Sequence, residues 1–349
     1  MIMKNQWIYL PVFIGTFFIG ACTPNPEKND SSNVPFPQST IGASVSSIET
    51  NPFFQGMYKS MENVGKEQSN LTLLLDSAAN QQDKQNTQLD GMIERGAKAL
   101  VVNLADVGFG AEMVKKYCDK KIPVVYINRS PNEKSLAACD TAYFVDGDAA
   151  QAGVLQGLQV LKAWQANPQW DKNKDGKIQY AMIEGIPNHA GAMARTKWSV
   201  GTMENYPSLG VPVQKVLQDY GMFQAQATKE LMTKWVAQPE FANVEVILAN
   251  NDTMALGAVE ILQQNNQKIP VFGIDGSKAA LEAFNSGSMA GTVFNDFDAQ
   301  SRTAVRMAAN LAAGKPVLEG VPYEMEYKVV KVPYQDIHSD NIKDFMAIQ

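Results

Sequence analysis

The feature that most constrains the fold is a regular alternation of short apolar runs with segments of helical periodicity. Continuous apolar strands that alternate with helices are typical of parallel sheets with helices on both faces. The candidate strands are 41–48, 71–75, 99–103, 123–127, 178–183, 211–217, 244–249, 270–274 and 290–294. Helical segments between them include 82–95, 112–120, 149–164, 224–237 and 253–264. The alternation predicts an α/β protein.

The number of repeats predicts two lobes. A length of 349 residues allows two domains at roughly 100–200 residues each. About ten strand–helix units are more than one ordinary open sheet holds. We therefore expect two doubly wound lobes, each built on a parallel sheet.

The first 22 residues are typical of an export signal. Lys4 precedes an apolar stretch over 7–21, which is shorter than the ~20 residues of a transmembrane helix and matches the core of a signal peptide. Gly20 and Ala21 stand before Cys22, and this arrangement resembles the lipobox of bacterial lipoproteins. The resemblance implies a signal peptide over 1–22 with the lipid attached to Cys22. The alternative is an ordinary signal peptide with a chance cysteine.

Residues 23–40 are rich in Pro, Asn and Ser and contain little apolar surface. A segment of this composition buries too little to fold by itself. We expect a flexible tether between the anchor and the lobes.

Composition excludes several classes of function. The net charge is −6 and Lys and Arg form no cluster, which argues against a nucleic-acid partner. Two histidines and three cysteines rule out a zinc site of His and Cys and a disulfide framework. Cys118 and Cys139 could form one disulfide in an oxidising compartment or remain buried thiols. The sequence contains neither a nucleophile elbow nor a P-loop.

Polar side chains follow several predicted strands, where a doubly wound sheet binds its ligands. Asn offers a donor and an acceptor, Asp accepts from hydroxyl groups, Arg donates in a fork, and aromatic faces cover C–H surface. Such a set suits a polyhydroxylated ligand such as a sugar. The alternative is that each Asn or Asp only caps the following helix. The candidates are Asn128, His189, Arg195, Asn250, Asn251, Asp252, Asp275, Asn295 and Asp296, with Phe53, Phe54 and Phe223.

Residues 171–179 match a calcium-binding loop. Oxygen ligands stand at positions 1, 3 and 5, a glycine makes the sharp turn, and position 7 supplies a backbone carbonyl. These positions are Asp171, Asn173, Asp175, Gly176 and Lys177, with Gln179 at position 9.

Position 12 of this loop is Met182, where an EF-hand has a bidentate Glu. Met182 lies in the predicted strand 178–183, so the loop is not part of a helix–loop–helix hand. If calcium binds, its last carboxylate comes from elsewhere in the fold. The alternative is a polar turn without metal.

Several blocks, in the same order along the chain, resemble the bacterial galactose/glucose-binding proteins, which are substrate-binding components of sugar ABC transporters. The blocks are 171–179, 244–252, 269–275, 291–296 and 328–334. The resemblance implies the type I periplasmic binding protein fold, with three hinge crossings near 146–149, 296–298 and 330–334. The N-terminal lobe would comprise 41–146 and 298–330, and the C-terminal lobe 149–295 and 334–349.

The same resemblance implies two ligand sets. For structural Ca²⁺ it implies Asp171, Asn173, Asp175, the carbonyl of Lys177, Gln179 and Glu245, whose carboxylate replaces the missing position 12. For the sugar it implies Asn51, Phe53, Asn128, His189, Arg195, Phe223, Asn251, Asp275 and Asn295.

Three positions depart from the family pattern. Asn51 and Gly191 stand where the family has aspartates, and Phe223 stands where it has a tryptophan. Losing a carboxylate that accepts from a sugar hydroxyl costs about 1–3 kcal/mol unless another group replaces it. These departures leave open which hexose binds.

We therefore expect a monomeric, calcium-stabilised lipoprotein without enzymatic activity, anchored through Cys22 on the periplasmic or outer face of the cell membrane. Its lobes would close over a monosaccharide, galactose or glucose, and deliver it to an ABC permease. A chemoreceptor is left open as a second partner. The alternatives are a sensory receptor for another monosaccharide, a glycosidase using Asp275 with another carboxylate, and a transcriptional repressor. The shortage of paired acids argues against the glycosidase, and the lipobox against the repressor.

Overall fold

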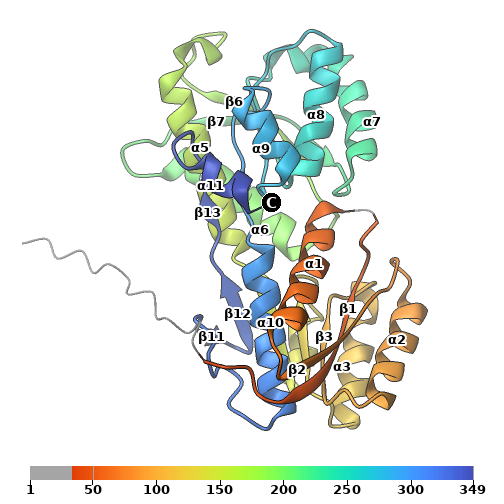
Figure 1. The fold of residues 1–349 in the computed structure, drawn as a ribbon. Coiled ribbons are helices and arrows are strands. Elements are labelled where there is room, and N and C mark those ends of the chain that lie inside the picture. Colours follow the sequence, from red (N-terminus) through yellow and green to blue (C-terminus); the bar gives the residue numbers. More distant parts are fainter. Residues whose placement is uncertain (1–33, 50, 349) are drawn as a thin grey trace, which may run out of the picture.

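The computed structural model describes residues 34–49 and 51–348. The predicted signal peptide and its Cys22 lie outside the described residues. Figure 1 shows two lobes joined by several segments of chain. The lobe that contains the first strand is called the N-lobe below, and the other the C-lobe.

The N-lobe is built on a seven-stranded sheet with the order β11-β12-β5-β4-β3-β1-β2. All neighbouring strands are parallel except β11, which is antiparallel to β12. The strands are β1 Ser39–Val45, β2 Leu71–Ser77, β3 Ala99–Val102, β4 Val124–Ile127, β5 Ala142–Gly147, β11 Met325–Glu326 and β12 Val329–Val332.

Helices cover both faces of this sheet, which explains its continuous apolar strands. Val101 and Val125 point into a core with α1 and α10, whereas Leu100 and Val124 point into a second core with α2 and α3. A strand that buries both faces shows no polar alternation. The helices of this lobe are α1 Pro52–Glu67, α2 Gln82–Glu94, α3 Gly110–Asp119, α4 Glu133–Ala137 and α10 Phe297–Ala312, with a 3₁₀ turn at Val107–Phe109.

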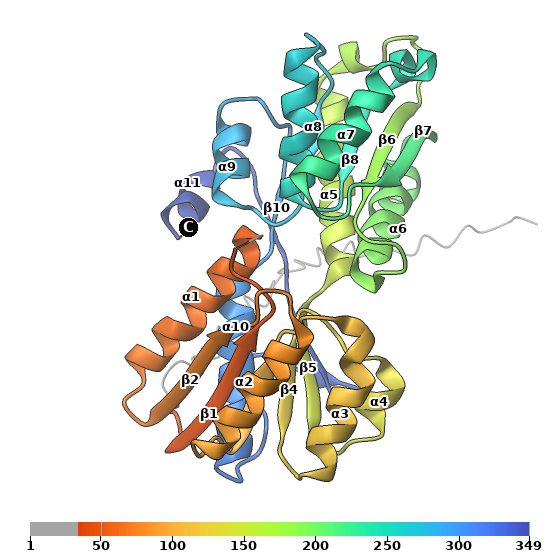
Figure 2. The ribbon, with the colours of Figure 1, turned by 90° about the vertical axis from the view of Figure 1, so that its right-hand side faces the viewer.

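The C-lobe repeats this design on a four-stranded parallel sheet with the order β7-β6-β8-β9. Helices α5 and α6 contribute to the core on one face, and α7 and α8 to the core on the other (Figure 2). Two short antiparallel strands, β10 and β13, extend this lobe. The strands are β6 Ile178–Glu184, β7 Val213–Tyr220, β8 Val246–Ala249, β9 Val271–Phe272, β10 Val293–Phe294 and β13 Gln335–Asp336. The helices are α5 Ala149–Ala166, α6 Ala190–Asn205, α7 Ala225–Val236, α8 Asp252–Gln264, α9 Lys278–Asn285 and α11 Ile342–Ala347, with 3₁₀ turns at Pro168–Trp170 and Pro239–Asn243.

The chain passes between the lobes three times, from β5 to α5, from β10 to α10 and from β12 to β13. Residues far apart in the sequence therefore meet at the junction of the lobes. The prediction of an α/β protein with two parallel sheets is confirmed.

Several elements were not predicted, among them β5, α1 and α10. Helix α10 buries polar side chains together with apolar ones, among them Gln300, Ser301, Arg306 and Asn310. The predicted strands 270–274 and 290–294 also shorten to two residues each, Val271–Phe272 and Val293–Phe294.

The predicted tether over 23–40 extends too far along the chain, and its end at residue 40 is wrong. Strand β1 begins at Ser39, and the preceding residues lie against the N-lobe. Arg306 donates to the carbonyls of Val34 and Pro35 at 2.6 and 2.9 Å, and its guanidinium lies 3.7 Å from the centre of the Phe36 ring. The segment from 34 onward therefore belongs to the lobe, because a buried Arg fastens it.

Of the two states left open for Cys118 and Cys139, the structure has the disulfide, with the Cα atoms 5.9 Å apart. Cys139 belongs to the N-lobe core, and Cys118 packs against it. The bond links the end of α3 to the loop before β5. Among the described residues, no helix is long and apolar enough to cross a membrane.

Removing this disulfide is expected to destabilise the N-lobe by about 3 kcal/mol, because the bond closes a loop over a sequence separation of 21 residues. The double variant Cys118→Ser/Cys139→Ser should melt several degrees below the wild type, measured by calorimetry with and without dithiothreitol. Dithiothreitol should lower the melting temperature of the wild type and leave that of the variant unchanged. Equal melting of the oxidised wild type and the variant would contradict the prediction.

Candidate functional site

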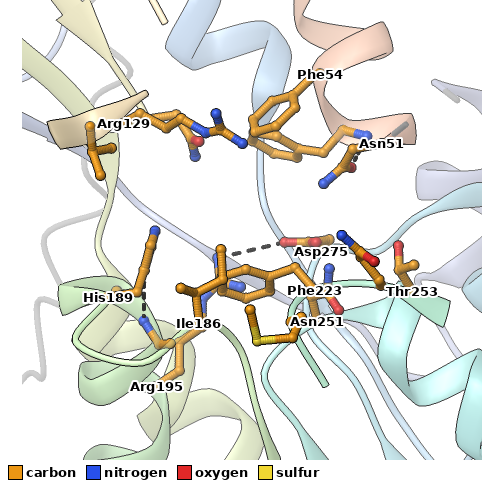
Figure 3. Close-up of a pocket in the computed structure, with 18 of the residues that line it drawn as sticks. Asn51, Phe54, Arg129, Ile186, His189, Arg195, Phe223, Asn251, Thr253 and Asp275 are labelled. Atoms are coloured by element: carbon orange, nitrogen blue, oxygen red, sulfur yellow. Dashed lines mark hydrogen bonds and ion pairs between the residues drawn. The ribbon is translucent and has the colours of Figure 1, made fainter. Parts of the chain in front are cut away.

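A cavity of about 880 Å³ lies between the lobes and is lined by residues from both. Figure 3 shows side chains facing one another across it, with Asn51, Phe54 and Arg129 on one side and His189, Phe223 and Asp275 on the other. The structure brings together all nine residues of the predicted sugar set at this cavity: Asn51, Phe53, Asn128, His189, Arg195, Phe223, Asn251, Asp275 and Asn295.

Three of these residues cap helices and line the cavity at the same time. The side-chain oxygen of Asn51 accepts from Phe53 N at 2.9 Å at the start of α1. That of Asn251 accepts from Met254 N at 3.0 Å at the start of α8. Capping therefore uses only the side-chain oxygen, and the N–H groups of each side-chain amide can still donate to a ligand. Helix capping and cavity lining, set against each other in the sequence analysis, occur together.

His189 caps α6 in the same way, since its Nδ1 accepts from Ala192 N at 3.2 Å. Burial and the nearby positive charges of Arg195 and Arg129 lower the pKa of His189 to about 4. The imidazole is therefore neutral at pH 7, and its proton is on Nε2 because Nδ1 is the acceptor. His189 is a hydrogen-bond donor of the cavity wall.

The stability of the protein should fall in acid through His189. The pKa of His189 is about 4 in the folded state, below its ordinary value of 6.5, so the unfolded state binds more protons between these values. The contribution of the neutral ring to the free energy of unfolding is complete above pH 6.5 and is lost as the pH falls towards 4. His189→Asn, which can still cap the helix, should lose this dependence.

The measurement is the free energy of unfolding by urea at pH 7.5 and 4.5, compared between wild type and His189→Asn. The variant is needed for comparison because other groups also titrate in this range. Burial raises the pKa values of Asp146 and Asp252 to about 7, and their contribution to the stability of the fold falls as the pH rises. The wild type should lose more stability on acidification than the variant. Equal losses would contradict the assignment of a low pKa to His189.

Arg195 is held by the protein itself. Its Nη1 donates to the carbonyl of Asn250 at 2.6 Å, and its Nη2 donates to the Tyr334 hydroxyl at 2.6 Å and lies 3.6 Å from an oxygen of Asp275. Its Nε is buried without a hydrogen-bond partner in the described part of the chain. Tyr334 and Asp275 hold the pKa of Arg195 above its ordinary value despite burial. Arg195 thus supplies a fixed positive charge that orients Asp275.

Asp275 is the carboxylate at the centre of the C-lobe wall. Asn295 donates from Nδ2 to an oxygen of Asp275 at 3.1 Å and accepts at Oδ1 from Gln300 at 2.7 Å. These two hydrogen bonds determine which way the Asn295 amide points. Burial raises the pKa of Asp275, an effect that Arg195 and Asn295 oppose. Asn295 therefore acts as a positioning residue for Asp275.

Aromatic rings lie on both sides of the cavity. Phe53 and Phe54 form an edge-to-face pair with centres 6.0 Å apart, and Phe223 lies 5.2 Å from the His189 ring in the same geometry. Phe223 has a positive φ of 56°, and a Cβ atom at Gly185 would overlap its ring. The glycine is required because the ring lies directly on its backbone.

Arg129, Tyr334 and Asp146 are among the cavity residues that the sequence did not predict. Arg129 directly follows the predicted Asn128, and Tyr334 lies in the third passage between the lobes, which was identified only as a hinge. Asp146, at the first passage, also lines the cavity. Arg129 could have been found from the sequence because it directly follows a predicted site residue. No local feature of the sequence identifies Tyr334, because its partner Arg195 is 139 residues away.

The departure at Gly191 also has a structural consequence. Gly191 lines the cavity, and a Cβ atom there would lie 3.2 Å from the His189 ring. The bare backbone leaves room beside the imidazole. No carboxylate is available at this point of the wall.

The predicted calcium loop is folded by its own side chains. Asp171 accepts from Asp175 N at 3.1 Å and from Gly176 N at 3.0 Å, and Gly176 has a φ of 72°, as the sharp turn requires. Glu245 accepts from Lys172 N at 2.7 Å and from Gln179 N at 3.1 Å, at the two ends of the loop. The structure thus brings Glu245 to the loop from 66 residues away.

The loop brings together three carboxylates, of Asp171, Asp175 and Glu245, and contains three lysines, Lys172, Lys174 and Lys177. Glu245 is only 1% exposed, and burial together with the negative charges of Asp171 and Asp175 raises its pKa. Lys172 directs its ammonium group to the carbonyl of Val244 at 2.6 Å. None of the three carboxylates forms an ion pair with a described residue, and no described group of three or more His, Cys, Asp and Glu side chains is arranged to hold a metal by itself. The residues present fit a cation that would also use amide and carbonyl oxygens.

Comparison of the sequence with known proteins finds relatives of one family. A family model described as "Periplasmic binding protein domain" matches residues 41–316. The chain is 36% identical over 306 residues to the D-galactose/methyl-galactoside binding periplasmic protein of Haemophilus influenzae, covering 88% of this chain and 91% of that protein. It is 26% identical over 323 residues to a ribose import binding protein of Bacillus subtilis, covering 91% and 97%.

Solved structures agree with the observed architecture. An ABC transporter solute-binding protein from Bacillus halodurans C-125 with bound myo-inositol superposes with a TM-score of 0.72 at 26% identity. The superposition covers 90% of this chain and 99% of that one.

Proposed function

The chain belongs to the periplasmic binding protein family, and on this basis we propose that it binds a monosaccharide between its lobes and delivers it to an ABC permease. The membership confirms the prediction that the chain is a binding protein and not an enzyme. The proposed ligand is galactose or glucose, as for the relative that binds D-galactose and methyl-galactoside. The alternative is a sensory protein for another monosaccharide.

The observation that carries the proposal is the chemistry of the cavity wall. Asn51, His189 and Asn251 have donors remaining after helix capping, and Asp275 is a buried carboxylate acceptor. Phe53 and Phe223 supply apolar rings from opposite lobes. A sugar presents hydroxyl groups around its edge and C–H groups on its faces, and this wall complements both.

The arrangement also supports binding by closure. Because the two lobes each contribute contacts, a ligand that bridges them stabilises the form in which the lobes are close. A permease would recognise that closed form. The three chain passages near 147–149, 294–297 and 332–335 would bend during closure.

Titration calorimetry with the protein lacking residues 1–22 tests this function. D-galactose, D-glucose, D-ribose and myo-inositol serve as the panel. We expect saturable heat with at least one hexose and recovery of the sugar unchanged. Absence of heat with every sugar of the panel would refute the proposal, and release of a modified product would show an enzyme.

We also propose that Asp171, Asn173, Asp175, Gln179, Glu245 and the carbonyl of Lys177 hold a structural Ca²⁺. Support comes from the burial of Glu245 and from the lack, among the described residues, of an ion pair to its carboxylate or to those of Asp171 and Asp175. Calcium would place a positive charge in direct contact with these carboxylates and tie strand β6 to the segment before β8. The site lies outside the residues that line the cavity, so its role would be stability and not ligand binding.

Export and anchoring through Cys22 remain part of the proposal. They rest on the sequence of residues 1–22, which lie outside the described part of the chain. Labelling of expressing cells with radioactive palmitate should mark the wild type and not Cys22→Ser. Incorporation into both, or into neither, would argue against a lipid on Cys22.

A further inference from the structure

The backbone of Asp275 has a conformation that residues with a Cβ atom rarely adopt. Its φ is 133°, and its side chain faces the cavity from the C-lobe side (Figure 3). Its N donates to the carbonyl of Val293 at 2.8 Å, and its carbonyl accepts from Asn295 N at 3.1 Å. Backbone strain of this kind persists only where the surrounding structure enforces it, and it occurs most often at functional sites. We therefore looked for the groups that enforce it.

Asp252 holds the residues on both sides of Asp275. Its backbone N donates to the carbonyl of Ile274 at 2.7 Å, and one oxygen of its carboxylate accepts from Ser277 N at 2.7 Å. The other oxygen accepts from the Thr292 hydroxyl at 2.6 Å. Asp252 therefore connects the start of α8, the loop after β9 and the segment before β10.

The Thr292 hydroxyl completes this arrangement, because it accepts from Gly276 N at 3.2 Å while it donates to Asp252. Each residue of the loop 274–277 thus has a backbone group in a hydrogen bond to α8 or to the segment 292–295. The loop that carries Asp275 is fixed at every position.

Neither Asp252 nor Thr292 is placed to touch a ligand, since they are 1% and 0% exposed and do not line the cavity. The position is costly for a carboxylate. Burial and the negative charge of Asp275 raise the pKa of Asp252 to about 7, and no ion pair within the described part of the chain includes Asp252. Gly273 also has to be a glycine, because a Cβ atom there would overlap an oxygen of Asp252. The value of this carboxylate therefore lies in the loop that it holds.

We propose that Asp252 and Thr292 are positioning residues that hold the backbone of Asp275 in place for the ligand. The inference rests on the proposed function, in which Asp275 accepts from hydroxyl groups of the monosaccharide. Arg195 and Asn295 orient the side chain of Asp275, whereas Asp252 and Thr292 fix its backbone from behind the wall. An acceptor that is fixed before the ligand arrives loses little freedom on binding, and this raises the affinity.

The first test compares Asp252→Ala with the conservative variant Asp252→Asn. Dissociation constants are measured by titration calorimetry with whichever of D-galactose, D-glucose, D-ribose and myo-inositol binds the wild type most tightly. We expect Asp252→Ala to weaken binding about 10- to 100-fold, because the loop loses the acceptor for Ser277 N and Thr292. Asp252→Asn should recover most of this loss, since an amide can accept from the one and donate to the other.

Thr292→Val and Thr292→Ser test the same arrangement with less risk to the fold. Valine keeps the shape of threonine without the hydroxyl, whereas serine keeps the hydroxyl without the methyl group. The affinity should follow the hydroxyl, with a loss of about 3- to 10-fold in Thr292→Val and a smaller loss in Thr292→Ser. A loss in Thr292→Ser as large as that in Thr292→Val would overturn the inference.

A double-mutant cycle with Asp275→Asn shows whether the effect passes through Asp275. In the Asp275→Asn background, Thr292→Val should weaken binding by less than about twofold, because the carboxylate that Thr292 positions is already gone. A merely structural role would weaken binding by the same factor in both backgrounds, and this outcome would also overturn the inference.

Leu262→Ala is the control for lost stability in the same helix. Leu262 is buried in the C-lobe core near the other end of α8 and does not line the cavity. Its truncation should lower the melting temperature and leave the affinity within about twofold of wild type. A loss of affinity in Leu262→Ala equal to that in Asp252→Ala, or no loss in either Asp252→Ala or Thr292→Val, would contradict the positioning role. A wild type that binds none of the probes would instead refute the proposed function.

Discussion

Replacing Asp275 with asparagine is expected to raise the dissociation constant of the proposed sugar about 100- to 1,000-fold. The carboxylate is the buried acceptor of the C-lobe wall, oriented by Arg195 and Asn295. Hydrogen bonds to a charged group contribute ~1.5–3 kcal/mol each, and a carboxylate can accept from two hydroxyls. Calorimetric titration of wild type and variant with the same sugar measures the loss.

The fold should survive this change, which separates binding from stability. The asparagine oxygen can still accept from Asn295, and Arg195 keeps its hydrogen bonds to Asn250 and Tyr334. Asp340→Asn, an exposed change away from the cavity, is the matched control and should bind as the wild type does. Unchanged affinity in Asp275→Asn would remove this residue from the ligand site.

Removing calcium is expected to lower the melting temperature by about 5–10 °C. At a calcium concentration 100 times the dissociation constant, binding contributes about 2.7 kcal/mol, and each kcal/mol shifts the melting temperature by roughly 2–4 °C. Without a cation the carboxylates of Glu245, Asp171 and Asp175 have no ion-pair partner among the described residues, and their mutual repulsion opposes folding. Scanning calorimetry in excess calcium and in EDTA, with the metal content measured in both, gives the shift.

Glu245→Gln should abolish this shift. It removes the buried carboxylate that stands in for the Glu missing from position 12 of the loop. Glu240→Gln is the control, since Glu240 is exposed on the 3₁₀ turn just before Glu245. Its melting temperature should still depend on calcium as that of the wild type does. A wild type that melts at one temperature with and without bound calcium would contradict the structural role of the metal.

The predicted strands with two buried faces were the most successful part of the fold prediction. Runs such as Ala99–Val102 and Val124–Ile127 are apolar at every position because each face packs on its own set of helices. The burial of Gln300, Arg306 and Asn310 in helix α10 could not be predicted, because residue type alone places such polar side chains at the surface. The segment from Val34 to Phe36 has the composition of a tether, yet Arg306 holds it on the lobe.

The predicted site residues meet at one cavity because the carboxyl ends of parallel strands share one edge of each sheet. Asn128 follows β4, Asn251 follows β8 and Asp275 follows β9, so a local reading of strand ends located them. Tyr334 could not be found in this way. It reaches the cavity through the third passage between the lobes and bonds to a residue 139 positions earlier.

Periodicity and residue type are local properties, and they were enough to predict the α/β class, the two parallel sheets and the kinds of side chain at the strand ends. Which atoms of those side chains already bond to the protein is known only from the folded structure. Arg195 donates to residues 55 and 139 positions away, whereas Arg129 keeps three donors at the cavity wall. Such partners depend on how distant segments pack and are therefore visible only in the folded chain.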